Sequence, residues 1–142
     1  MVEDELTYAV IGCAMKVHSS LGPGFLETVY RNALQYELAK SGLAFEAERA
    51  MLVHYDGIVV GDFFADLALE ERLIIELKAV RRLTQQHEAQ LVNYLTATGI
   101  DIGLLINFGG ASLEYRRKHR IYKPRENSRD DQLGSDAAER DW

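Results

Sequence analysis

Cysteine is nearly absent from this sequence of 142 residues, in which Cys13 is the only one. A disulfide within the chain and a zinc site built from cysteines are therefore both excluded. Long apolar runs are also lacking, because no stretch approaches the roughly 20 residues that cross a bilayer. The first residues are not a basic segment followed by an apolar one, as in a secretion signal. We therefore predict no membrane association and expect a cytoplasmic protein.

Basic residues are too few for a protein that coats nucleic acid by bulk electrostatics, since the net charge is −6. Residues 127–142 contain five acids and only two arginines, so the remaining chain is only mildly acidic. The length suits one domain with a real core. We predict a single domain over residues 1–123 and a disordered polar tail over 124–142, which has almost no apolar residues.

Apolar periodicity predicts an α/β domain. Spacings of three and four indicate helices, alternation indicates half-buried strands, and the run Ile102–Phe108 is typical of a fully buried strand. The turn Asp56-Gly57 favours a hairpin. We expect a central mixed sheet of four or five strands, with the two N-terminal helices on one side and the third on the other. The predicted helices are 4–20, 25–41 and 84–98, and the predicted strand segments are 43–47, 50–55, 58–69, 73–80 and 102–108. Residues 113–122 are either an edge strand or an exposed segment.

The most informative stretch runs from Asp62 to Lys78, where two apolar strands are interrupted by charges. Asp66 lies in the first strand, whereas Glu76 and Lys78 lie two apart in the second and leave the same face. Lone charges on apolar strands are costly, so a partner is expected. Two carboxylates on neighbouring strands are suitable Mg²⁺ ligands, and a lysine beside them could orient a metal-bound water. A structural acid–lysine pair at the end of a sheet remains the alternative.

Other polar residues accompany these charges. Glu27 lies in the first turn of the second helix, either complementing the helix dipole or pointing into the metal site. Arg81 and Arg82 either face solvent or contact phosphate. Gln90 and Tyr94 are one helical turn apart and project together from the face that also carries Leu91, so Gln90 is expected to point inward. The basic residues between 116 and 120 suggest a second surface for nucleic acid, although basic runs are usually solvated.

The motif Gly24-x-x-Glu27-x-x-Tyr30 resembles the signature of the GxxExxY proteins, a small family placed within the PD-(D/E)XK nuclease superfamily. Asp66 followed by Glu76-Leu77-Lys78 resembles the core acid and the E-x-K element of that superfamily. Gln90 and Tyr94 resemble the Q-x-x-x-Y helix motif of its RecB-type members. The resemblance covers residues 5 to about 122. One position departs from the pattern, because Ala65 stands where the name of the superfamily has proline.

The resemblance implies a restriction-endonuclease-like core that uses Mg²⁺ or Mn²⁺ to hydrolyse phosphodiester bonds, with DNA favoured over RNA as the substrate. Asp66 and Glu76 would be metal ligands, Lys78 the catalytic cation and Glu27 an auxiliary catalytic acid. Gln90 and Tyr94 would contact substrate or steady the site. Arg81 and Arg82, from their position next to Lys78, remain candidate phosphate contacts.

Two alternatives stay open at this point. The chain could be a non-catalytic binding or scaffold protein that keeps the nuclease fold, and such a protein could be a homodimer. It could also be a metal-dependent phosphatase acting on small nucleotides, which would suit the acidic net charge. Metal binding separates the first alternative from a nuclease, and competition between mononucleotides and DNA separates the second.

Overall fold

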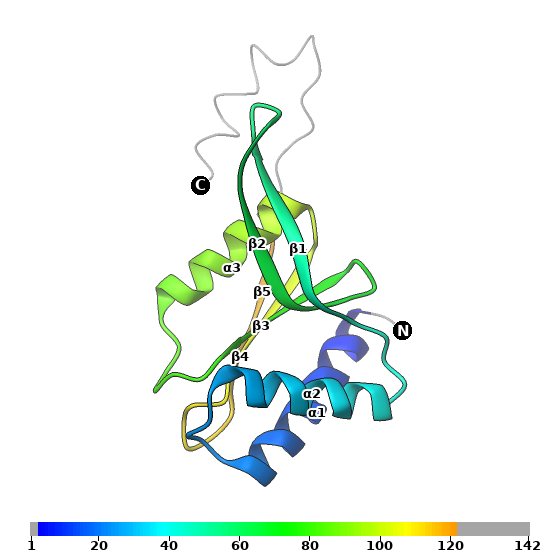
Figure 1. Ribbon diagram of the computed structural model, residues 1–142, viewed down its shortest axis with the longest axis vertical. Helices are drawn as coiled ribbons and strands as arrows, with labels where there is room; N and C mark the ends of the chain where they lie inside the picture. Colours follow the sequence, from blue (N-terminus) through cyan, green and yellow to red (C-terminus); the bar gives the residue numbers. More distant parts are fainter. Residues whose placement is uncertain (1–2, 122–142) are drawn as a thin grey trace.

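A computed structural model describes residues 3–121, and the predicted tail at 124–142 lies outside the described residues. Figure 1 shows helices and strands arranged around one sheet. The helices are α1 (Glu3–Leu21), α2 (Glu27–Lys40) and α3 (Gln85–Thr98); the strands are β1 (Glu46–Tyr55), β2 (Ile58–Leu69), β3 (Leu73–Lys78), β4 (Ile102–Asn107) and β5 (Glu114–His119).

The five strands form one mixed sheet in the order β1-β2-β3-β4-β5. Strands β3 and β4 are parallel and connected through α3, whereas the other neighbouring pairs are antiparallel. This arrangement confirms the predicted α/β class and the mixed sheet, and β3, α3 and β4 form a strand-helix-strand crossover. The two inner strands β3 and β4 are also the most buried, since every residue of β4 and most residues of β3 are buried.

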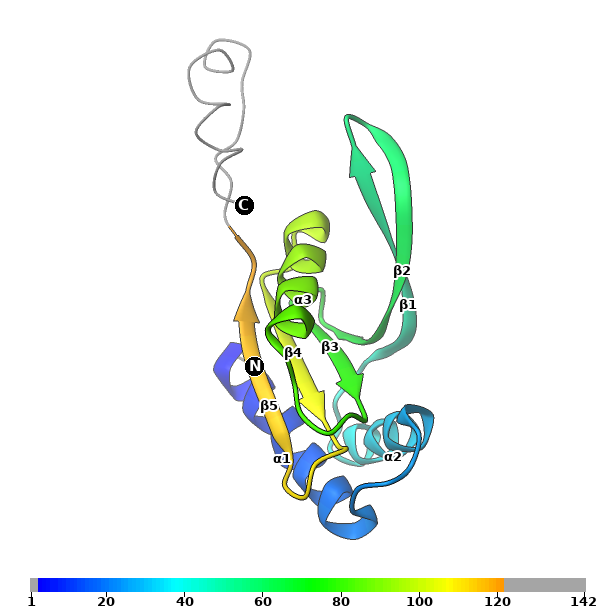
Figure 2. The same ribbon diagram turned by 90° about the vertical axis from the view of Figure 1, so that its left-hand side faces the viewer.

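Apolar side chains alternate along the inner strands and so build a core on each face of the sheet. The first core contains Ile75 and Leu77 of β3, packed with apolar residues of α1 and α2. The second contains Ile74, packed with Leu91 and Leu95 of α3. Figure 2 shows α3 on one side of the sheet and the N-terminal helices on the other, as predicted.

The structure corrects two predicted boundaries. One strand, β1, covers most of the region predicted as two, because pairing with β2 continues on both sides of Glu48. Glu48 itself has a φ of 51°, in the left-handed region that non-glycine residues rarely adopt. Helix α2 begins at Glu27 instead of Phe25, since Leu26 has extended backbone angles of −74° and 159°.

Tight turns join the antiparallel strands. Asp56 and Gly57 have φ values of 52° and 77°, which confirms the predicted hairpin between β1 and β2. Glu70 and Glu71, with φ values of 54° and 55°, turn the chain between β2 and β3. The second turn is compatible with the register that places Leu67 opposite Ile75. Over residues 3–121, no helix is long and apolar enough to span a membrane.

Candidate active site

Asp66 and Glu76 lie beside each other on neighbouring strands. Leu67 of β2 pairs with Ile75 of β3. Asp66 directly precedes Leu67 and Glu76 directly follows Ile75, so in this antiparallel register the two acids lie opposite each other. The Oδ2 atom of Asp66 accepts a hydrogen bond of 2.8 Å from the backbone N–H of Leu77. This bond ties the first carboxylate directly to the strand that carries the second, so their relative position depends on the sheet itself.

Glu76 is the most perturbed acid of the site. Burial raises its pKa from 4.5 to about 8, and the negative charges of Asp66 and, more weakly, Glu27 add to the increase. The backbone of Asp66 and the ammonium of Lys78 act on the pKa in the opposite direction. The Oε1 atom of Glu76 is buried and has no hydrogen-bond partner among the described residues. A buried carboxylate oxygen without a donor is costly, and a cation would relieve that cost.

Lys78 follows Glu76 by two residues on β3 and therefore leaves the same face of the strand. The lysine is only partly buried, and its positive charge lowers the pKa of Glu76. The structure thus brings Asp66, Glu76 and Lys78 together where β2 meets β3, as the sequence predicts. Two acids and one cation converge there on strands whose other residues are mostly apolar.

Glu27 reaches the same region from another element. It is the first residue of α2, and its charge contributes to the raised pKa of Glu76. The preceding loop is fixed by the fully buried Tyr30, whose hydroxyl donates to the carbonyl of Gly22 at 2.6 Å and accepts from the N–H of Phe25 at 3.1 Å. The ring of Tyr30 stacks on Phe108, with 4.7 Å between the ring centroids. Tyr30 therefore holds the start of the helix that presents Glu27.

Sequence reasoning missed Arg31, which binds two acids at this site. Its Nη2 atom lies 2.6 Å from Oε1 of Glu48, and its Nη1 atom lies 3.6 Å from Oδ1 of Asp66. The arginine side chain is only 20% exposed, and its Nε atom is buried without a partner among the described residues. One signal could have revealed it: Arg31 follows Glu27 by four residues, so both leave one face of α2.

Gln90 and Tyr94 form a separate pair on α3. Nε2 of Gln90 donates to the hydroxyl of Tyr94 at 3.1 Å, and the Tyr94 ring stacks on Phe63 of β2 with 3.7 Å between centroids. Gln90 is exposed, which corrects the expectation that it points inward. The inward positions of that face are taken by Leu91 and Leu95. Within residues 3–121, neither Gln90 nor Tyr94 hydrogen-bonds to the acids or to Lys78.

Arg81 and Arg82 lie in the loop that leaves β3 just after Lys78, and both are exposed. The loop is held by buried Asn107, which bonds to both the N–H and the carbonyl of Val80 at 2.9 Å. In the described part of the chain, no ion pair involves Arg81 or Arg82. Their guanidinium groups are thus presented to solvent on a fixed loop next to Lys78.

Three residues of the basic cluster around β5, which is predicted as a second surface for nucleic acid, form ion pairs with acids. Lys118 lies 3.0 Å from Glu88, and Arg120, which follows β5, lies 2.7 Å from Asp101. Arg116 lies 3.3 Å from Glu114 and 3.9 Å from Glu88. β5 is an edge strand, and these three basic residues pair with Glu88, Glu114 and Asp101.

The donor set can be tested for its fit to a metal ion. Over residues 3–121, no cluster of three or more His, Cys, Asp or Glu side chains is arranged to hold a metal. The site instead offers a pair: the unpartnered Oε1 of Glu76 and the Oδ1 of Asp66, which lies 3.6 Å from Arg31. Mg²⁺ is commonly held by one or two carboxylates, with water and phosphate completing its coordination. The pair therefore fits a divalent ion that keeps several waters.

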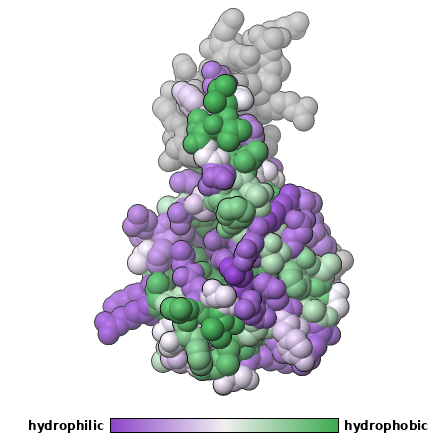
Figure 3. All heavy atoms as spheres, in the orientation of Figure 1, coloured by the Kyte–Doolittle hydropathy of each residue, from purple (hydrophilic) through white to green (hydrophobic). Residues whose placement is uncertain are grey.

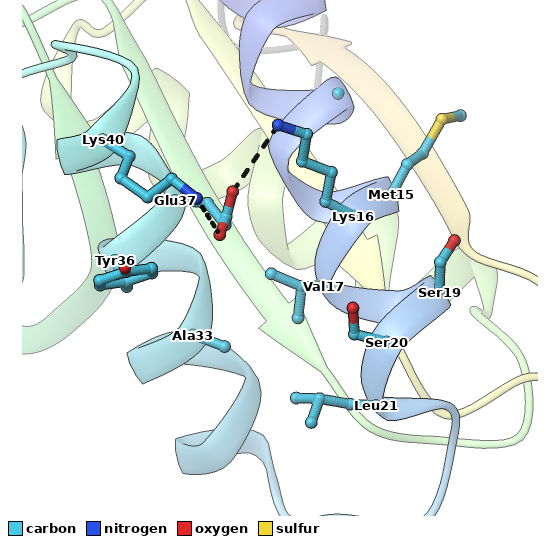
Figure 4. A pocket seen from close by; sticks show the side chains of 11 residues that line it. Met15, Lys16, Val17, Ser19, Ser20, Leu21, Ala33, Tyr36, Glu37 and Lys40 are labelled. Carbon is cyan, nitrogen blue, oxygen red and sulfur yellow. Dashed lines mark ion pairs between the residues drawn. The ribbon is translucent and has the colours of Figure 1, made fainter.

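The surface groove between α1 and α2 does not coincide with this site. A groove of about 670 Å³ lies between α1 and α2, where Glu37 lies 4.0 Å from Lys16 and 3.6 Å from Lys40 (Figure 4). None of Glu27, Asp66, Glu76 and Lys78 lines this groove. The candidate catalytic residues thus lie at the junction of β2 and β3 and not in this groove.

A family comparison agrees with the geometry at the strand junction. The model of the PD-(D/E)XK nuclease superfamily matches residues 4–118, which spans all eight helices and strands except the last residue of β5 and the first of α1. The chain belongs to the PD-(D/E)XK nuclease superfamily. Nucleases of this superfamily typically use divalent metals, in agreement with the carboxylate pair.

A structural comparison shows the fold alone. The chain resembles the crystal structure of SSO0001 with a TM-score of 0.53 and 18% sequence identity. The similarity covers 68% of this chain and 52% of that one, so this PD-(D/E)XK domain spans about half the length of its structural neighbour. No curated protein matches the sequence.

Proposed function

We propose that this protein is a metal-dependent nuclease that hydrolyses phosphodiester bonds in DNA, with RNA as a less favoured substrate. The observation that carries the proposal is the unpartnered Oε1 of Glu76 beside Asp66 and Lys78 in a member of a nuclease superfamily. A scaffold protein has no need for a buried carboxylate oxygen without a donor. A metal site does need such an oxygen, because an oxygen without a hydrogen-bond donor is free to coordinate a cation.

In this proposal each residue of the site has a role that follows from its position. Asp66 and Glu76 would hold Mg²⁺ or Mn²⁺, which when bound supplies Lewis-acid polarisation of the scissile phosphate. Lys78, on the same strand face as Glu76, would orient the attacking water or stabilise negative charge on the phosphate. Glu27 would act as an auxiliary acid from the start of α2. Arg31 would position Asp66, whose other oxygen is already fixed by the N–H of Leu77.

The substrate would lie across the exposed rim of this site. Arg81 and Arg82, which follow Lys78 on a fixed loop, would contact phosphates. Gln90 and Tyr94 would contact the substrate from α3, where the stacked ring of Tyr94 limits their movement. The subfamily of GxxExxY proteins, a cytoplasmic location and a homodimer belong to the same proposal.

The test is cleavage of single-stranded, double-stranded and branched DNA, and of RNA, in Mg²⁺ and in Mn²⁺. Wild type is compared with Lys78→Ala and Asp66→Ala. Lys40→Ala and Asp101→Ala serve as matched controls, because both residues form ion pairs away from the site. We expect wild type and controls to cleave, and both site variants to lose about 100-fold or more in rate while remaining folded.

The other outcomes are equally informative. Cleavage that persists in Lys78→Ala and Asp66→Ala would show that the activity does not come from this site. If nothing is cut and neither metal binds, the proposal fails and a binding protein with the nuclease fold becomes the better description. Strong inhibition by mononucleotides, with weak competition from DNA, would point instead to a phosphatase.

A further inference from the structure

The side chain of Arg31 on α2 lies between two acids that come from different strands. Its Nη2 atom lies 2.6 Å from Oε1 of Glu48 on β1, whereas its Nη1 atom lies 3.6 Å from Oδ1 of Asp66 on β2. The first distance is that of a close ion pair, and the second exceeds the length of a hydrogen bond. The guanidinium is therefore held by Glu48 and is an electrostatic neighbour of Asp66.

The sheet itself places the acids of this region in a row. The pairs that flank Glu48 in the register of β1 against β2 set it across from Asp66, and Asp66 in turn lies across from Glu76 on β3. Glu48 has a φ of 51° inside a strand, and such a conformation persists only where the surrounding structure fixes it. Carboxylates on adjacent strands repel one another unless cations offset their charges. Arg31 supplies one such cation from α2.

The surroundings of Arg31 keep its guanidinium beside these acids. The side chain is 20% exposed, and its Nε atom is buried without a partner among the described residues. An arginine keeps its charge in such surroundings and so needs acids close by. Glu48 is exposed, and Figure 3 shows mainly hydrophilic residues on the surface between the β1–β2 hairpin and α2. Ions in solution can therefore reach this cluster of charges.

Asp66 has one oxygen left for a metal ion, and Arg31 lies beside that oxygen. The Oδ2 atom of Asp66 accepts the hydrogen bond from Leu77, so Oδ1 is the atom that remains. A positive charge beside a carboxylate disfavours the binding of a further cation there, just as it lowers the affinity for a proton. Glu48 acts in the opposite direction, because it holds the guanidinium and offsets its charge. Arg31 and Glu48 thus have opposing effects on the affinity of Asp66 for metal.

We propose that Arg31 competes with the divalent ion for Asp66, and that Glu48 limits this competition by holding the guanidinium. The inference rests on the proposed metal-dependent nuclease and concerns the regulation of its site. Arg31 and Glu48 are positioning residues, which together set the metal concentration at which the site is filled. At low metal concentrations Arg31 neutralises Asp66 in place of the metal, and the nuclease stays inactive.

The test is calorimetric titration of Mn²⁺ into the full chain at pH 7, with wild type, Arg31→Met, Glu48→Gln and the double variant. Arg31→Met removes the competing charge and should bind Mn²⁺ about tenfold more tightly than wild type. Glu48→Gln releases the guanidinium towards Asp66 and should weaken binding by about threefold. Because Glu48 acts through Arg31, Glu48→Gln should have a smaller effect when Arg31→Met is also present.

A second ion pair of the same kind provides the matched controls. Arg49 on β1 lies 2.6 Å from Glu71, and the exposed fractions of these two side chains are close to those of Arg31 and Glu48. Arg49→Met and Glu71→Gln therefore remove the same charges from a similar pair that does not contact Asp66. Both controls should keep the Mn²⁺ affinity of wild type to within about twofold.

Thermal unfolding supplies a readout that does not depend on calorimetry and checks that each variant is folded. In EDTA, Arg31→Met should unfold at a lower temperature than wild type, because the acids around Asp66 lose a cation. Saturating Mn²⁺ should then raise its unfolding temperature by more than it raises that of wild type, since tighter binding stabilises the native state more.

Two results would overturn the proposal. The first is an affinity of Arg31→Met for Mn²⁺ that equals or falls below that of wild type, as expected if the arginine only supports the fold. The second is an effect of Glu48→Gln that is the same with and without Arg31, which would mean that Glu48 acts on the ion directly. In both cases, wild-type binding that is lost in Asp66→Asn would leave the metal site itself intact. No binding of Mn²⁺ to wild type would instead contradict the metal-dependent nuclease, and this inference with it.

Discussion

Several residues at the site adopt energetically unfavourable arrangements that the rest of the structure maintains. Glu76 keeps an unpartnered buried oxygen, Arg31 keeps a buried Nε without a partner among the described residues, and Glu48 keeps a left-handed backbone. Each of these arrangements costs free energy in a folded protein. They meet around Asp66, because Arg31 contacts both Glu48 and Asp66. Unfavourable arrangements that concentrate in one place are typical of functional sites.

The raised pKa of Glu76 predicts how stability changes with pH in the absence of metal. The native carboxyl keeps its proton up to about pH 8, whereas the unfolded one loses it near 4.5. The native state therefore binds more protons between these values, so stability falls as pH rises through this window. Glu76→Gln removes that loss. We expect the variant to be more stable than wild type by a few kcal/mol at pH 9.

Urea denaturation in EDTA at pH 5 and at pH 9 measures this effect. At pH 5 the two proteins should have similar free energies of unfolding, because glutamine resembles a protonated glutamate in size and hydrogen bonding. Glu37→Gln is the control, since Glu37 pairs with Lys16 of α1 and with Lys40 of its own helix, away from the site. A Glu76→Gln variant whose stability depends on pH in the same way as that of wild type would show that Glu76 is ionised in the native protein.

Most elements of the fold can be predicted from the sequence, because their patterns are local. The alternation in β2 and the periodicity of α3 need no knowledge of the rest of the chain, and both predicted ends of Ile58–Leu69 are correct. The prediction of two strands in place of β1 is wrong because Glu48 and Arg49 interrupt its alternation, and only pairing with β2 shows that the strand continues. Arg31 escapes prediction since its partners come from β1 and β2, distant in sequence.

The loop after β3 predicts a specific dependence on salt. Arg81 and Arg82 are exposed and outside any described ion pair, whereas Arg116 and Arg120 are bound to acids. Replacing both Arg81 and Arg82 by alanine should weaken DNA binding, because two phosphate contacts are lost. The slope of log K against log salt should become shallower by about 2, at roughly 0.9 for each contact.

Fluorescence anisotropy with a labelled duplex, at several salt concentrations and with Ca²⁺ in place of Mg²⁺ to slow cleavage, gives both quantities. The double variant Arg116→Ala/Arg120→Ala removes the same formal charge and serves as the control. It should alter the slope little, since those residues already neutralise Glu88, Glu114 and Asp101. Equal effects of the two double variants would mean that only net charge matters and that the loop has no particular role.

At the scale of the whole molecule, the sheet separates two tasks. Its inner strands and both cores build a rigid body, and the junction of β2 with β3 presents the acids. The same β2 also pairs with β1 in a hairpin that exposes several large apolar residues. The sequence motif predicts Asp66, Glu76 and Lys78 because each lies on a recognisable strand. The exposed residues of this hairpin cannot be predicted in this way, since apolar residues lie on both of its faces and only the fold shows which of them pack against α3.

The most direct measurement is calorimetric titration of Mn²⁺ into wild type, Asp66→Asn and Glu76→Gln at pH 7. These substitutions preserve size and remove one ligand charge each. The account predicts binding to wild type and to the control Glu37→Gln, and affinity about tenfold weaker or more in both site variants. Binding should also release protons, because the metal replaces the proton held by Glu76. No binding to wild type, or equal binding to all four proteins, would contradict a metal site at the β2–β3 junction.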